Sequence, residues 1–372
     1  MNDVERALPQ TVLREATDRR LLDETIRQVR TTRAELAAAT GYSRPTVSEA
    51  VRRMVAGGLL DATGLKETGK RGRVGTFYSL GARAGRVLAV EIDQSGVQVR
   101  AADLAGRTLS EQHRAPTAPG DTDSLAGSLR AAVREAAGGP GPLRAVGVSI
   151  ANPVDPVSHE TVPLAGTPFP EGLLNAVTLI GDLVSAPVLV DNDVNLAALA
   201  EHRLGRAAGV SSFAYVYVGA GLGVGLYIGD QLIRGAHGLA GEIGYLPGRT
   251  SSTLATDLAA AGFGRSDAPS NDVAAVLTLL EAADDDALHR LAEGVRRAIV
   301  SVAAVVDPAL VLLGGPVGTH PALLPRVRDL VAGSFPGPTR IDRGTLGADA
   351  PLHGALQMAV EHARAAAVYG LR

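Results

Sequence analysis

Apolar residues near the start of the chain recur with helical spacing. A first helix is predicted from four apolar residues that share one face: Leu21, Leu22, Ile26 and Val29. Just downstream, Thr32-Arg33-Ala34-Glu35 has the pattern of a capping box, in which Thr32 and Glu35 satisfy each other's free backbone N–H groups. This pattern predicts a short second helix, Ala34 to Thr40, that ends at Gly41.

The stretch from Gly41 to Leu60 predicts a third helix with one apolar and one polar face. Ser43 is a favourable N-cap, Pro45 falls in the first turn, where its missing N–H costs nothing, and Gly57-Gly58 ends the helix. The apolar stripe consists of Val47, Ala50, Val51 and Met54. The residues off this stripe are polar and mostly basic: Arg44, Thr46, Ser48, Glu49, Arg52 and Arg53. Two short helices joined by a tight turn, the second with Arg at its start, form a helix-turn-helix signature, with a solvated helical hairpin on an enzyme as the alternative.

The next segment, DATGLKETGKRGRVGTFYSL, reads as two short strands with Gly69 to Gly75 as the turn between them. Such a hairpin after a helix-turn-helix is a wing. Its tip, Lys70-Arg71-Gly72-Arg73, has the composition that places Arg side chains in a narrow minor groove. The predicted DNA-binding residues, with Arg44 and Thr46 nearest the base edges, are Ser43, Arg44, Thr46, Ser48, Arg52, Arg53, Lys70, Arg71 and Arg73.

The body of the chain repeats one order of elements. After a Gly-rich segment, Gly81 to Gly85, which we interpret as a hinge, the pattern predicts three strands, a helix and a buried strand, at residues 87–92, 97–102, 107–112, 125–137 and 145–150. A similar order returns with strands at residues 213–218, 224–228, 231–234 and 310–313. Two copies of this unit around a crevice are typical of actin-like ATPases and sugar kinases.

Composition limits the chemistry that the chain can perform. There is no Cys, and the eight His are scattered without ligand spacing, so neither a disulfide nor a structural zinc site is expected. Charge is uneven, at +4 for residues 1–80 and −7 for the remainder, which suits a DNA-binding head on a body that does not touch phosphate. We find no apolar run near 18 residues and no signal peptide, so we expect a cytoplasmic protein without a membrane partner.

Three runs in the body resemble the ROK family of sugar kinases and transcriptional repressors. They are VDNDVNLAALAE (Val190 to Glu201), VGAGLGVGLYIGDQLIRGAHGLAGEIGY (Val218 to Tyr245) and VVDPALVLLGGP (Val305 to Pro316). In the head, TRAEL and SRPTVS followed by a wing resemble the repressor branch. The resemblance covers nearly the whole chain. It implies an α/β protein with an N-terminal winged helix-turn-helix followed by a two-lobed, actin-like body of the duplicated ribonuclease H type.

The resemblance also implies which ligand-binding residues remain. In family kinases an Asp in an Asn-Asp-x-Asn stretch takes the proton from the sugar hydroxyl, and here Asp193 matches it beside Asn192. Glu242 matches the Glu of the Ala-Gly-Glu-Ile-Gly motif. Asn192, Asp193 and Glu242 are therefore the predicted effector-binding residues. Asp193 as a helix cap and Glu242 as a surface charge remain the alternatives.

The phosphate and zinc motifs of the family are altered. Family kinases open with Asp-x-Gly-x-Thr, and here these positions hold Glu91, Asp93 and Ser95; the phosphate-binding Thr of the second turn is Ala220. An anionic Asp93 would repel ATP, so we predict that the body is not an enzyme, has no catalytic residues and needs no cofactor. The family's zinc-binding His is Tyr245, and Leu246 to Asp257 contains no Cys. The resemblance also implies that Ala255 stands where the family has a sugar-binding Glu, and that Phe169 replaces a family Trp near the sugar.

These observations predict a DNA-binding transcriptional regulator. We expect a winged helix-turn-helix at 1–80, an N-terminal lobe at 86–206 with a C-terminal helix at 352–372, and a C-terminal lobe with the dimerisation surface at 207–351. The expected partner is double-stranded DNA, an inverted-repeat operator bound by a homodimer or tetramer, with repression as the favoured mode. A sugar phosphate or an unrelated metabolite is preferred over a neutral hexose as effector. An active sugar kinase with a DNA-binding head and a ligand-independent DNA-binding protein remain alternatives.

Overall fold

The computed structural model of the chain describes residues 10–66, 75–118, 120–164, 169–249, 252–264 and 270–371. The head contains three helices and a small sheet of strand order β1-β3-β2. Its elements are α1 (Gln10–Gln28), β1 (Thr31–Thr32), α2 (Arg33–Thr40), α3 (Arg44–Ala56), β2 (Leu60–Lys66) and β3 (Gly75–Leu80). The predicted capping box of α2 is present, and Gly41 ends that helix in the left-handed conformation. The head therefore has the predicted helix-turn-helix followed by a two-stranded wing.

One helical residue was predicted wrongly in the head. Val29 follows the end of α1, has a φ of 63° and is 63% exposed, so it does not extend the apolar stripe. Burial on α1 instead includes Thr25, whose hydroxyl donates to the carbonyl of Leu21 at 2.8 Å, and Asp18. A buried carboxylate on an otherwise apolar face requires a charged partner, and that partner is on α3.

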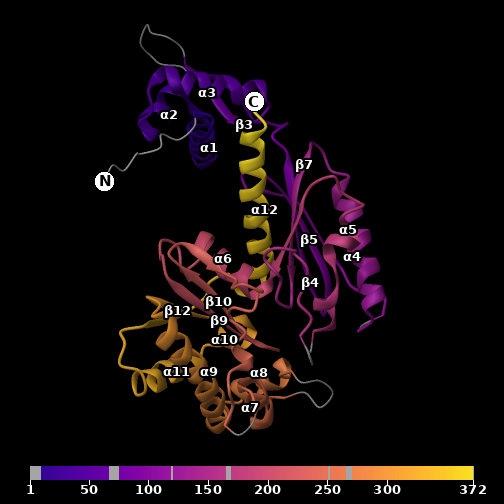
Figure 1. Cartoon of the computed structure of the whole chain (residues 1–372), viewed down its shortest axis with the longest axis vertical. Helices are drawn as coiled ribbons and strands as arrows, with labels where there is room; N and C mark the ends of the chain where they lie inside the picture. Colours follow the sequence, from indigo (N-terminus) through magenta and orange to yellow (C-terminus); the bar gives the residue numbers. More distant parts are fainter. Residues whose placement is uncertain are drawn as a thin grey trace, which may run out of the picture.

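The first lobe of the body is a five-stranded sheet of order β6-β5-β4-β7-β8, with α4 and α5 on one face (Figure 1). Strands β4, β7 and β8 run parallel, so their carboxyl ends meet at one edge of the sheet. The elements are β4 (Arg86–Asp93), β5 (Gly96–Asp103), β6 (Thr108–Arg114), α4 (Thr122–Ala137), β7 (Leu143–Ile150), η1 (Pro170–Leu173), α5 (Ala176–Ile180), β8 (Val188–Asn192) and α6 (Asp193–Leu204).

The second lobe has a five-stranded sheet of order β11-β10-β9-β12-β13. Its strands are β9 (Phe213–Val218), β10 (Leu222–Ile228), β11 (Gln231–Ile233), β12 (Leu310–Gly314) and β13 (Arg340–Arg343). Its helices are η2 (Ile243–Tyr245), α7 (Leu254–Leu258), η3 (Ala259–Phe263), α8 (Val273–Glu281), α9 (Asp285–Val306), α10 (Gly315–Gly318), α11 (Leu323–Ala332) and η4 (Gly347–Asp349). The predicted repeat of strands is confirmed. No helix in the described ranges has the length and apolarity of a bilayer-spanning segment.

Helix α12 (Ala350–Tyr369) connects all parts of the molecule (Figure 1). It packs against α6, β4 and β7, and its C-terminal end lies against α1 of the head. The contact with α6 is close, because a Cβ at Gly354 would lie 2.0 Å from the carbonyl oxygen of Leu196. Only a residue without a side chain fits there. Helix α12 therefore runs from the junction of the two lobes to the head.

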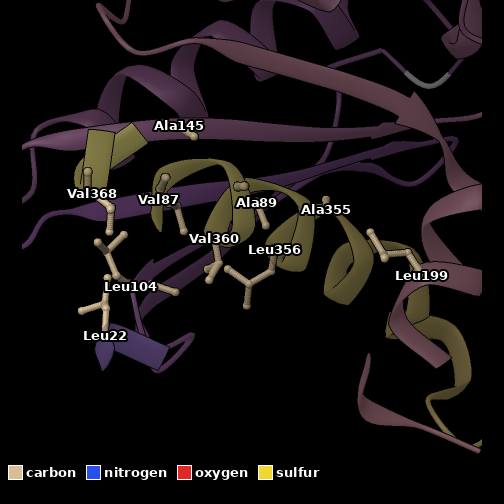
Figure 2. Close-up of a cluster of buried hydrophobic side chains, with 14 of the residues drawn as sticks. Leu22, Val87, Ala89, Leu104, Ala145, Leu199, Ala355, Leu356, Val360 and Val368 are labelled. Atoms are coloured by element: carbon tan, nitrogen blue, oxygen red, sulfur yellow. The ribbon is translucent and has the colours of Figure 1, made fainter. Parts of the chain in front are cut away.

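The head and the body share one hydrophobic core (Figure 2). Leu22 of α1 lies beside Leu104 of the first lobe and Val368 of α12, and the same cluster continues to Leu356 and Leu199. Polar contacts reinforce it, since Arg364 donates to the carbonyl of Leu104 at 2.7 Å and pairs with Asp23 at 3.3 Å. A patch of this kind holds the head in one orientation on the body.

The segment from Gly81 to Gly85 is not the open hinge that its glycines predicted. Gly81 donates to the carbonyl of Leu59 at 2.8 Å, and a Cβ on it would lie 2.5 Å from the carbonyl oxygen of Gly58. Ala82 donates to the Asp61 carboxylate at 2.8 Å, and Ala84 is fully buried. These glycines allow close approach of two backbones, so the segment is docked between head and body.

Candidate functional site

Helix α3 presents a polar face to solvent. Ser43 caps it by accepting a hydrogen bond from the N–H of Thr46 at 3.3 Å, and the two hydroxyls lie 2.8 Å apart. The predicted apolar stripe is fully buried against the rest of the head. Arg44 and Thr46 are exposed at the first turn, and Ser48 is half-buried one turn later. The N-terminal end of a helix exposed in this way is the part that recognition helices insert into the major groove.

The two adjacent arginines of α3 have different surroundings. Arg52 is 72% exposed and pairs with Glu49 at 2.7 Å on the outer face. Arg53 is only 19% exposed, and its guanidinium donates to both carboxylate oxygens of Asp18 at 2.7 and 3.2 Å. Asp18 is the buried acid of α1, with a side chain 2% exposed. Arg53 thus packs α3 on α1, and we remove it from the proposed DNA surface because its charge is already neutralised inside the head.

Two aromatic residues of β3, one of the strands of the wing, lie close to arginine side chains. The guanidinium of Arg30 lies over the Phe77 ring of β3, 3.9 Å from its centroid, and that of Arg33 lies 5.3 Å from the centroid of Tyr78. The predicted minor-groove residues Lys70, Arg71 and Arg73 lie outside the described residues, so their role stays a prediction.

A cavity of about 300 Å³ lies between the two lobes of the body. All three predicted effector residues, Asn192, Asp193 and Glu242, line it. They come from the carboxyl end of β8, the start of α6 and the segment before η2. A concave site with a mostly apolar wall and few polar groups is the usual form of a small-molecule pocket. The predicted residues are therefore brought together by both lobes.

Asn192 and Asp193 are oriented by the N-terminus of α6. Asn192 is the N-cap, and its side-chain oxygen accepts from the N–H groups of Val194 and Asn195 at 3.0 and 3.2 Å. The Asn192 amide donates to the carbonyl of Asn152 and to the Asp193 carboxylate, at 3.2 and 3.0 Å. Asp193 is thus the first residue of the helix and not its cap.

The carboxylates around the cavity are electrostatically unfavourable together. Burial, with a smaller effect of Glu171, raises the pKa of Asp193 to about 6. Burial and the charge of Asp193 raise the pKa of Glu242 to about 7, and burial followed by repulsion from Asp93 raises that of Glu91 to about 8. Each shift means that removal from water, with a smaller effect of repulsion from neighbouring acids, disfavours the ionised form of these groups. Glu242 is half-buried in the cavity wall and is not a surface charge.

The preference for a sugar phosphate finds no support in this wall. None of the described residues that line the cavity is a Lys, Arg or His. Arg234, which lies near α6, is held by the buried Asp191 at 2.6 Å. A phosphate ester placed here would meet carboxylates without a compensating cation among the described lining residues, and the choice of effector stays a prediction.

The first phosphate turn is occupied by its own side chain. One carboxylate oxygen of Asp93 accepts from the N–H of Ser95 at 2.7 Å, from its hydroxyl at 2.6 Å and from the N–H of Gly96 at 3.1 Å. Backbone N–H groups in such a turn are the groups that cradle phosphate oxygens. Asp93 therefore both repels an anion and takes its hydrogen-bond donors.

The second phosphate turn is bound by a neighbouring side chain. The N–H of Gly219 donates to the carbonyl of Gly221 at 3.0 Å, and the Asn271 amide donates to the carbonyl of Gly219 at 3.0 Å. The backbone N–H of Asn271 also donates to the carbonyl of Ala220, at 2.9 Å. This turn lies in the cavity wall, where Tyr245 and Ala255 also lie. Within the described ranges, no three His, Asp or Glu side chains gather as a metal ion would require.

Sequence reasoning missed two residues near the cavity. Glu171 of η1 is 4% exposed, and burial raises its pKa above the ordinary range. Tyr217 lines the cavity from β9, although its place in the strand pattern indicated only a core residue. The signal for Tyr217 was the polar hydroxyl at a buried strand end next to a Gly-rich turn. Nothing in the local sequence distinguished Glu171 from a surface acid.

Both the head and the body of the chain match models of known protein families. A model described as "ROK family" matches residues 87–257, and one described as "Winged helix-turn-helix DNA-binding" matches residues 14–61. The xylose repressor of Bacillus spizizenii is 23% identical over 241 residues, which cover 64% of this chain and 62% of the repressor. The glucokinase of Streptomyces coelicolor is 32% identical over 167 residues, which cover 43% of this chain and 49% of the kinase.

A solved structure shares the whole architecture. A ROK family transcriptional regulator, described as a homolog of the E. coli MLC protein, superposes with a TM-score of 0.72 over 96% of this chain and 99% of its own. At 18% identity, this likeness concerns the fold. The chain spans between 37% and 62% of the length of the curated relatives described as NanE/NanK, xylose repressor and glucokinase.

Proposed function

From the premise that the chain belongs to the ROK family, we propose that it is a DNA-binding transcriptional regulator. The single observation that carries this proposal is helix α3, a capped helix whose exposed face carries Arg44, Thr46 and Arg52. Such a face suits insertion into the major groove, with Arg44 at base edges and Arg52 near the phosphate backbone. Because one winged helix covers few base pairs, two copies of the chain would bind an inverted repeat.

The body, in this proposal, binds a small molecule and does not phosphorylate it. The relationship to a glucokinase leaves enzymatic activity open at the level of the family. Two features of this chain favour loss of that activity: Asp93 fills the first phosphate turn with its own carboxylate, and Asn271 engages the second. The first removes backbone donors that a nucleotide's phosphates would need, and at the second turn the N–H of Gly219 is already donated to the carbonyl of Gly221. The cavity beside Asp193 remains large enough for a ligand.

The DNA proposal is tested by selecting bound sequences from random DNA pools with wild type, Arg44→Ala and Arg52→Ala. We expect an inverted repeat for wild type, relaxed base preference with a loss of about 1 to 3 kcal/mol for Arg44→Ala, and a uniform weakening for Arg52→Ala. Arg114→Ala is the matched control, because Arg114 is an exposed, ion-paired arginine of the body. Selection of no sequence by wild type, or equal losses in all three variants, would contradict the proposal.

The sensing part is tested by linkage. Helix α12 and the shared core join the lobe junction to the head, so a ligand that favours one arrangement of the lobes shifts the position of the head. Coupling is reciprocal, and operator DNA should change the affinity for effector by the same factor, typically about 5 to 150-fold, as effector changes the affinity for DNA. Asp193→Ala and Glu242→Ala should abolish this effect. An unchanged response in both variants would place the effector elsewhere, and no response to any metabolite in a broad screen would favour the ligand-independent protein.

A further inference from the structure

The wall of the inter-lobe cavity is rich in acid and poor in base. Asp193 and Glu242 line it, and among its described lining residues no side chain carries a positive charge. Behind them, Glu91 and Glu171 add two more half-buried or buried carboxyl groups whose pKa values are raised by burial. Buried acids are normally paired with a cation or a metal. The wall itself holds two acids, Asp193 and Glu242, and no Lys, Arg or His among its described lining residues to pair with them.

Two arginines near these acids, Arg234 and Arg100, are already paired with other carboxylates. Arg234 binds Asp191 at 2.6 Å, and Asp191 is itself only 2% exposed. Arg100 of β5 pairs with Glu111 of β6 at 3.1 Å. If Arg234 left its partner, the buried Asp191 would remain in the interior as an unpaired charge. The charge missing from the cavity is therefore not supplied by these neighbours.

Aromatic side chains form another part of the same wall. Phe169, Tyr217 and Tyr245 line the cavity, together with apolar groups such as Leu222. Aromatic rings attract cations through their negative faces, and they give no comparable attraction to anions. A cavity of about 300 Å³ with carboxylates and aromatic rings has the composition that recognises organic ammonium groups.

We propose that this cavity selects a small organic amine, bound as its ammonium ion against Asp193 and Glu242, over neutral or anionic molecules of similar size. The inference rests on the proposed function, since it assigns the ligand class of the same sensing site. A neutral polyol would find hydrogen-bond acceptors in this wall but would bring no positive charge to the two carboxyl groups. A phosphate or carboxylate ligand would add to their repulsion.

The experiment compares sets of three small molecules in which the amine and the anion each differ from the neutral member in one group. D-glucosamine, D-glucose and D-glucose 6-phosphate form one set, and cyclohexylamine, cyclohexanol and cyclohexanecarboxylate form another, within a library of such sets. Binding to the full chain without DNA is measured by ligand-observed NMR and calorimetry at neutral pH. We expect hits among the amines, each at least tenfold tighter than its neutral partner, and no binding of the anions.

Two nearly isosteric variants locate the charge. Asp193→Asn and Glu242→Gln keep the shape of the wall and should each weaken amine binding at least tenfold, whereas Glu135→Gln, at an exposed acid paired with Arg114, should leave it unchanged. The comparison within each set in wild type does not depend on how well the variants fold. A neutral or anionic member that binds as tightly as its amine, the absence of any amine hit, or amine binding that survives both variants would overturn the inference.

The two proposals can fail separately. Because amine binding is measured without DNA, its absence leaves DNA selection by α3 untouched. Amine binding that depends on Asp193 but does not change operator affinity would support the ligand class and contradict the sensing role.

Discussion

Replacing Arg53 tests whether this residue holds the head together or touches DNA. Its guanidinium makes two hydrogen bonds to Asp18, at 2.7 and 3.2 Å, and the Asp18 side chain is 2% exposed. In Arg53→Ala this carboxylate would stay buried without a partner. Removing one partner of a buried ion pair typically costs about 3 to 5 kcal/mol. Because Arg53 keeps 19% exposure, water can reach the vacated space, and we expect a loss near the lower end, about 3 kcal/mol.

A double variant separates stability from recognition. Replacing both partners with apolar residues, Asp18→Leu with Arg53→Met, removes the buried charge and should restore the free energy of unfolding to within about 1 kcal/mol of wild type. If Arg53 is structural, this variant also binds the selected operator with unchanged affinity. The matched residue is Arg52, which is 72% exposed: Arg52→Ala should weaken operator binding without a measurable change in stability.

Unfolding is followed in urea by circular dichroism, and operator affinity by fluorescence anisotropy, on the same preparations. If Arg53→Ala lowers the free energy of unfolding by less than about 1 kcal/mol, the variant does not leave Asp18 as a buried, unpaired carboxylate, and the structural role of Arg53 is refuted. A double variant that is stable but does not bind the operator would return Arg53 to the DNA surface.

Three further predictions use the same measurements. Leu22→Ala should lower the free energy of unfolding by about 2 to 5 kcal/mol, because Leu22 is fully buried in the core shared by head and body. Leu13→Ala, at a 52% exposed position of the same helix, should change the free energy of unfolding little. Equal effects of the two substitutions would contradict the shared core. Glu91 has a pKa raised from 4.5 to about 8, so the folded chain retains a proton that the unfolded chain releases. The contribution of Glu91 to the free energy of unfolding should therefore be complete below about pH 4.5 and be lost as the pH rises through about 8. Over this pH range the urea midpoint of wild type should therefore fall relative to that of Glu91→Gln. A difference between the two midpoints that stays constant with pH would refute the raised pKa. Finally, incubation with Mg-ATP should give no phosphorylation of glucose or N-acetyl hexosamines, and turnover that disappears in Asp193→Ala would support the reading as an active kinase. Metal analysis should find no stoichiometric zinc.

Local patterns were sufficient to predict most of the elements. The stripe from Val47 to Met54 and the strands of both lobes follow from periodicity, because their burial depends on residues a few positions apart. The family motifs then brought Asp193 and Glu242 together correctly in one cavity.

What could not be predicted depends on partners far away in the sequence. Arg52 and Arg53 lie at similar angular distances from the apolar stripe of α3, on opposite flanks, and only Asp18, 35 residues earlier, makes one of them structural. Glu201 looked like an ordinary residue of α6, yet it is fully buried and accepts the N–H groups of Thr345 and Leu346 at 2.6 and 2.9 Å. Asp93 was predicted to repel phosphate, but its hydrogen bonds within its own turn required the geometry of the folded chain.

The packing of α12 on the head also sets an order of events during synthesis. Asp23 and Arg364 are separated by 341 residues, so at roughly 5 to 20 residues per second the ribosome needs roughly 17 to 70 s to deliver the partner of α1. Throughout this interval the face around Leu22 lacks the cover that α12 supplies, although Leu104 of the first lobe is made much earlier. A nascent chain thus presents its DNA-reading part before the part that positions it, and chaperones that shield this face would keep unfinished molecules from associating through it.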